Sequence, residues 1–133
     1  MARIPAAHAR ARHTRLVSLF GYLRSSFLNL YYDCALGGPH LTKQQESDKM
    51  QIMWRDLLVK RADAIAELDD EVWIIEVSAD PGLRAIGQLQ SYRVLWLRDP
   101  KIAKPEKLVL VASTIEEDLL DVASTYGIQN YII

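Results

Sequence analysis

Two short apolar segments separated by a pair of aspartates constrain the fold of this chain more than any other feature. Residues 61–68 read RADAIAEL and residues 71–79 read EVWIIEVSA. Apolar runs of this length bounded by turn residues predict two strands, and a two-residue connection predicts a hairpin. Asp63 and Glu76 stand equally far from the turn, so the hairpin register predicts that they face each other.

Residues directly opposed in such a hairpin share one face of the sheet, with Cβ atoms about 4.5–5.5 Å apart. Strand alternation places Ser78 on the same face as Glu76. Opposed like charges are destabilising, so one carboxylate takes up a proton or a cation lies between the two. A hard cation such as Mg²⁺ suits carboxylate oxygens, and the backbone carbonyl near Val77 is a further candidate ligand.

The spacing leaves an alternative open for the two acids. Both lie near strand ends, where water or a neighbouring arginine can stabilise a carboxylate. Arg61 and Arg84 are the nearest candidates in the sequence. The hairpin alone therefore predicts either a metal-binding acid pair or two solvated or salt-bridged carboxylates.

The hydrophobic spacing around the hairpin predicts alternating helices and strands. TRLVSLFGYLRSSFLNLYY, residues 14–32, has helical spacing, and the following segment 41–60 has Thr42 as N-cap with Gln45 in a capping box. After the hairpin we predict a helix over 83–98, a strand over 107–114, a helix capped by Thr114 and ended by Gly127, and a short last strand. This alternation predicts an α/β layer structure with a mixed sheet.

The composition fits one globular domain. The chain has 133 residues, of which 50% are hydrophobic, and a formal net charge of -1. Cys34 is the single cysteine, which excludes an intrachain disulfide, makes a Cys/His zinc site improbable and favours a reducing compartment. No apolar run reaches the roughly 20 residues of a membrane span. We therefore expect a cytoplasmic protein, in a host cell, or a virion component.

The first part of the chain is basic. Arg3, Arg10, Arg12 and Arg15 fall in a stretch, residues 1–32, that contains no acid. We expect residues 1–12 to form an arm and residues 13–133 a single α/β domain. The arm is a candidate for contact with DNA or another nucleic acid, with an acidic protein, or with further copies of the chain.

The hairpin acids and the helix after them resemble the PD-(D/E)XK nuclease superfamily. The resemblance covers roughly residues 61–97: Asp63 on one strand, Glu76-Val77-Ser78 on the next, and GQLQSY on the helix. It implies a restriction-endonuclease-like αβββαβ core with a Mg²⁺ or Mn²⁺ site at Asp63, Glu76 and Val77. In such nucleases Gln88 and Tyr92 would position DNA or the nucleophile, although a structural role for both remains open. The segment PGLRAIGQL is also similar to small nuclease-like proteins of phage genomes.

The chain departs from that family at two points. Ser78 stands where the family has a lysine, and no acid occurs in the first predicted helix. Glu46 or Asp48 could supply that acid only if the second helical segment takes its place. These departures predict a degenerate nuclease, weak or inactive, that still handles nucleic acid. The alternative is a structural or assembly protein, such as a phage head, neck or tail component, that uses the nuclease fold as a scaffold.

Overall fold

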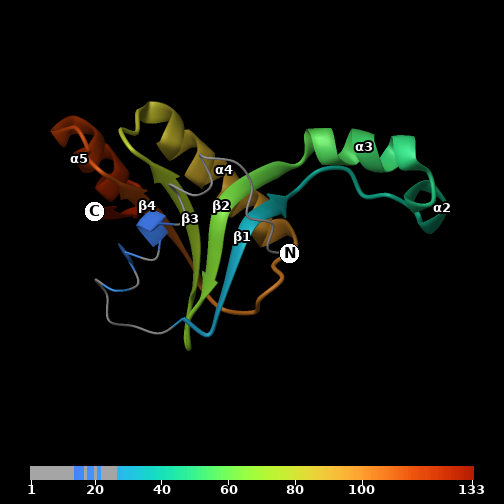
Figure 1. The fold of residues 1–133 in the computed structure, drawn as a ribbon, viewed down its shortest axis with the longest axis horizontal. Helices are drawn as coiled ribbons and strands as arrows, with labels where there is room; N and C mark the ends of the chain where they lie inside the picture. Colours follow the sequence, from blue (N-terminus) through green and yellow to red (C-terminus); the bar gives the residue numbers. More distant parts are fainter. Residues whose placement is uncertain (1–13, 17, 20, 22–26) are drawn as a thin grey trace.

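The computed structural model describes residues 14–16, 18–19, 21 and 27–133, which are built on one five-stranded sheet (Figure 1). The strands lie side by side in chain order. Neighbours are antiparallel from β1 to β3 and parallel from β3 to β5, so the sheet is mixed. The labelled elements are β1 (Asn29–Leu36), α2 (Lys43–Glu46), α3 (Lys49–Leu58), β2 (Lys60–Glu67), β3 (Val72–Ser78), α4 (Leu83–Arg98), β4 (Glu106–Ala112), α5 (Glu117–Thr125) and β5 (Gln129–Ile132).

The β2–β3 hairpin has the predicted register. Ala64 pairs with Ile75, and Glu67 pairs with Val72. The N–H of Leu68 donates to the carbonyl of Glu71 at 2.8 Å, which closes a turn with the two aspartates at its tip. The next step beyond the pair Ala64–Ile75 leads to Asp63 and Glu76, as the sequence predicts.

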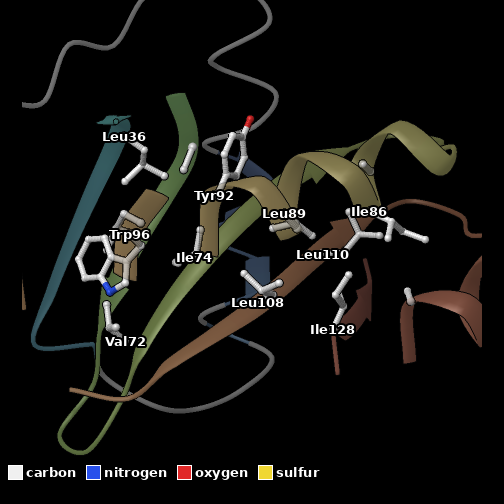
Figure 2. Packing of buried hydrophobic residues seen from close by; sticks show 14 of the residues in the cluster. Leu36, Val72, Ile74, Ile86, Leu89, Tyr92, Trp96, Leu108, Leu110 and Ile128 are labelled. Atoms are coloured by element: carbon white, nitrogen blue, oxygen red, sulfur yellow. The ribbon is translucent and has the colours of Figure 1, made fainter. Parts of the chain in front are cut away.

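Both faces of the sheet are buried, each against helical residues. On one face, α4 and α5 pack a cluster that includes Leu89 and Trp96 over Val72 and Ile74 of β3 (Figure 2). On the other face, Leu16 and Leu19, which are helical, belong to a cluster with Trp73 and Ile75. A strand covered on both faces has no polar side, which explains the continuous apolar runs of β3 and β4.

Three predicted boundaries are wrong. Residues 29–36 form the edge strand β1 and not the end of a helix, because they pair with β2 and their aromatic residues Tyr31 and Tyr32 pack on opposite faces of the sheet. The segment after Thr42 is two helices, because Asp48 caps α3 separately. The N-cap of α5 is Glu116 and not Thr114. The predicted capping box of Thr42 and Gln45 is confirmed.

The remaining elements agree with the sequence in order and type. Gly127 has a φ of 72°, which suits a glycine at the C-terminal end of α5. Within the described part of the chain, none of the helices combines the length and apolar character needed to cross a membrane. The expected arm, residues 1–12, lies outside the described residues.

Candidate active site

A cavity of about 500 Å³ lies at the carboxyl end of β3, where the chain enters α4. The hairpin, the helix α4 and the helical residues before β1 all contribute to its wall. The polar side chains that line it are those of Arg15, Asp63, Glu76, Ser78, Arg84 and Gln88. The four predicted site residues Asp63, Glu76, Ser78 and Gln88 are therefore brought together at one cavity.

Asp63 is fixed by the neighbouring strand. Its Oδ2 accepts a hydrogen bond from the backbone N–H of Val77 at 2.8 Å, just beyond the last backbone pair of the hairpin. The carboxylate thus takes the place of a strand carbonyl. Because the N–H and C=O of an extended residue point toward the same neighbouring strand, the carbonyl of Val77 is directed toward β2 as well.

Glu76 is held from the side of α4. The hydroxyl of Tyr92 lies near the Glu76 carboxylate, whose Oε2 is removed from solvent. Figure 2 shows the hydroxyl of Tyr92 directed away from the apolar cluster to which its ring belongs. Burial raises the pKa of Tyr92 from 10.0 to about 12. The charges of Glu76 and Asp63 and the hydrogen bond with Glu76 act in the same direction, and Arg84 opposes them. Tyr92 is therefore protonated at neutral pH, with a hydroxyl available as a donor beside Glu76.

The raised pKa of Tyr92 has a measurable consequence for stability. A folded-state pKa above the ordinary value means that stability is complete below about pH 10 and is lost as the pH rises toward about 12. Tyr92→Phe should remove this part of the loss, so its free energy of unfolding should fall less steeply than that of the wild type over this range. Urea denaturation at several pH values measures the slopes, with the exposed Tyr126→Phe as control. Equal slopes in wild type and Tyr92→Phe would show that the pKa of Tyr92 is not raised in the folded protein.

Two arginines lie beside the acid pair. Arg84, in the first turn of α4, and Arg15, from the helical residues before β1, both line the cavity. Arg61 instead lies 3.6 Å from Asp33 in an ion pair on β1 and β2. Of the cations considered from the sequence as neighbours of the acids, Arg84 is the one at the cavity. The position of Arg15 there was missed, although Leu16 and Leu19 next to it carried the helical spacing that fixes this segment on the sheet.

The other candidates lie elsewhere. Asp48 caps α3 through its side chain, and Glu46 lines a separate cavity with His40 and Arg55, so neither supplies a third acid to this site. Across residues 14–133, apart from the few positions not described, no group of three or more His, Cys, Asp or Glu side chains is arranged to hold a metal ion. The arm residues Arg3, Arg10 and Arg12 lie outside the described residues.

Comparison with known proteins identifies the fold. No protein-family model and no curated protein sequence matches the chain. A crystal structure of a protein of unknown function aligns with 89% of this chain and 55% of its own length, at a TM-score of 0.57 and 14% identity. A repair endonuclease from Pyrococcus abyssi aligns with 100% of this chain and 49% of its own length, at a TM-score of 0.53 and 12% identity.

The chain thus spans about half the length of the solved structures that it matches. At these identities the likeness concerns the fold. Taken with the strand order and the two helical layers, it leads to one conclusion: the chain is an α/β protein whose five-stranded mixed sheet, flanked by helices, has an endonuclease-like fold.

Proposed function

We propose that this chain is a metal-dependent DNA nuclease whose catalysis is weakened by the loss of the motif lysine. The observation that carries the proposal is the meeting of Asp63 and Glu76 at one cavity, beside two arginines, in a chain with an endonuclease-like fold. Paired carboxylates within a sheet are costly unless a proton or a cation offsets their charge. Arg15 and Arg84 line the same cavity, and with a divalent cation on the acids both guanidinium groups would be available to a phosphate.

The residues present fit a hard divalent cation. Asp63 and Glu76 supply carboxylate oxygens, and the carbonyl of Val77 points toward the same strand as the N–H that binds Asp63. Mg²⁺ is commonly held by one or two carboxylates, with water and substrate phosphate completing its shell, and Mn²⁺ accepts the same ligands. When bound, such an ion lowers the pKa of a coordinated water and offsets negative charge on a phosphodiester.

The rest of the cavity suits a phosphodiester. Among the residues that the structure describes at the cavity, the two carboxylates and the guanidinium groups of Arg15 and Arg84 give a formal charge of zero, to which a divalent cation would add positive charge. The N-terminus of the 16-residue helix α4 opens at the same place and favours negative charge. Arginine binds phosphate through paired N–H groups. We assign Arg15 and Arg84 to the phosphate, Gln88 to positioning of the DNA or of the attacking water, and Tyr92 to orientation of Glu76.

The weakness of the site lies at Ser78. A lysine at this position of the motif places a positive charge near the attacking water and the developing charge, which a neutral hydroxyl cannot do. Arg84 supplies charge but stays protonated, so it is a poor carrier of protons. Slow cleavage is therefore the expected phenotype, with binding of nucleic acid retained through the cavity and the basic residues Arg3, Arg10 and Arg12.

The proposal is tested by DNA cleavage in the presence of Mg²⁺ or Mn²⁺. Supercoiled plasmid and single-stranded DNA are incubated with the wild type and with the double variant Asp63→Ala/Glu76→Ala. We expect slow, metal-dependent cleavage by the wild type and none by the double variant. Cleavage that survives the double substitution, or that needs no divalent cation, would refute the assigned site.

A second candidate function follows from the same departure. With Ser78 in place of the lysine, the chain could serve as a structural or assembly protein, for example a phage head, neck or tail component, in which the acid pair is a relic. That alternative predicts no cleavage by the wild type and no response of the fold to divalent cations.

A further inference from the structure

Helix α3 presents a hydrophobic surface that no described part of the chain covers. None of its ten residues is buried. The large side chains of Met50, Met53, Trp54 and Leu57 are exposed by 70%, 58%, 49% and 82%, and Leu58 is 45% exposed. These five residues define the apolar face of α3. Contiguous exposed surface of this kind marks an interaction site more often than it is left open to water.

The helix belongs to the α2–α3 connection, residues 37–59, which projects from the sheet. Helices α2 and α3 form the connection between β1 and β2 and extend away from the layers of α4 and α5 (Figure 1). The apolar face follows the i, i+3, i+4, i+7 spacing of a helix that packs on something. Isolated helices shorter than about 12–15 residues are marginal in water. A ten-residue helix in a projecting connection therefore gains stability when its apolar face is covered.

The charge of the α2–α3 connection indicates which class of partner covers its apolar face. Between residues 37 and 59 three cations are balanced by three anions, so this connection has no net charge. Its charged residues are Lys43, Glu46, Asp48, Lys49, Arg55 and Asp56. Binding of nucleic acid depends on neutralisation of phosphates by an excess of cations, and the α2–α3 connection has no such excess. A neutral, mostly apolar surface fits another protein surface of the same character.

The flank of the helix fits a second copy of the same helix. Lys49 and Asp56 are seven residues apart, so they lie on the same side of α3, next to the apolar face, and both are exposed. When two α3 helices pair in antiparallel orientation about a two-fold axis, the flank of one helix that carries Lys49 and Asp56 faces the same flank of the other helix. Each end of the pair then joins a lysine to an aspartate, while Met50 and Met53 of one helix lie near Leu57 and Trp54 of the other.

We propose that two copies of this chain form a symmetric dimer through the apolar faces of their α3 helices, with Lys49 of each copy beside Asp56 of the other. A two-fold interface uses the same surface on both copies, which a self-complementary helix provides. The proposed dimer is independent of the metal site proposed at Asp63 and Glu76, because the α2–α3 connection lies apart from the residues of that cavity.

Sedimentation equilibrium of the full chain tests the dimer. We expect a mass that rises toward twice the chain mass of 15.1 kDa as the concentration increases. Leu57→Glu should raise the dissociation constant at least ~10-fold, because it places a charge within the apolar interface. Leu97→Glu, at a 55% exposed leucine of α4, is the matched control and should dimerise as the wild type does. A wild type that stays monomeric up to about 0.1 mM, or equal dimerisation by both variants, would overturn the proposal.

A charge reversal distinguishes antiparallel pairing from other modes of self-association. Lys49→Asp alone and Asp56→Lys alone each place like charges together at both ends of the dimer, so each should dimerise more weakly than the wild type. An equimolar mixture of the two variants restores opposite charges at both ends and should form a heterodimer. A mixture no more dimeric than its separate components would contradict the assigned orientation and, with it, the interface.

Discussion

Replacing Ser78 with lysine is expected to raise the rate of DNA cleavage by about 10- to 100-fold. Ser78 is the last residue of β3 and lines the cavity with Asp63 and Glu76, so a lysine there extends its ammonium group toward the acid pair. Loss of one group that stabilises developing charge typically costs 10²–10³ in rate, and its return should recover much of that. The measurement is the single-turnover rate at saturating DNA and Mg²⁺.

The control for this experiment is Ser124→Lys, an equal change of residue and charge at an exposed position of α5. It should cleave at the wild-type rate, which separates a local effect from a general gain of positive charge. Absence of cleavage by both the wild type and a folded Ser78→Lys protein would mean that the remaining site is no longer able to catalyse the reaction. That result would favour the assembly protein over the nuclease.

Replacing Leu89 with alanine is expected to lower the free energy of unfolding by about 2–5 kcal/mol. Leu89 is 0% exposed and belongs to the cluster that joins α4 to β3 and β4 (Figure 2). The substitution removes buried methyl groups and leaves a cavity that the surrounding side chains fill only in part. Urea denaturation of both proteins gives the difference in free energy.

Leu83→Ala provides the matched control on the same helix. Leu83 is 72% exposed, so the same chemical change there should alter the free energy of unfolding by less than about 0.5 kcal/mol. Equal losses at Leu83 and Leu89 would contradict the packing of α4 on the sheet. Since α4 also carries Gln88 and Tyr92, the position of these two residues depends on the same contacts.

The hairpin shows what local sequence can determine. Its register follows from the two aspartates of the turn and from the apolar runs on either side, and a shift of one residue would turn Asp63 away from the face of α4. The grouping of Asp63, Glu76 and Ser78 at one cavity was for this reason predictable, whereas Gln88 was expected there only from the family resemblance. The contact between Tyr92 and Glu76 was not, because helical spacing defines the face of α4 but not the distance from that face to the strand.

The errors arose where tertiary contacts outweigh local pattern. Tyr31 and Tyr32 continue the helical spacing of the preceding residues, yet pairing with β2 makes them part of a strand. The segment 41–60 was predicted to be helical, but helical spacing does not state what covers the apolar face of α3. Arg15 could not be placed at the cavity because its neighbours in space come from β2, β3 and α4, far along the sequence.

Binding of a divalent cation by Asp63 and Glu76 is the most direct test of this account. Isothermal titration with Mn²⁺, together with the thermal unfolding midpoint in millimolar Mg²⁺, compares the wild type with Asp63→Asn/Glu76→Gln, which keeps the shape of both side chains. We predict one bound ion and a higher midpoint for the wild type, and neither for the variant. A wild type that binds no Mn²⁺ and whose midpoint does not respond to Mg²⁺, or a variant that binds as the wild type does, would contradict it.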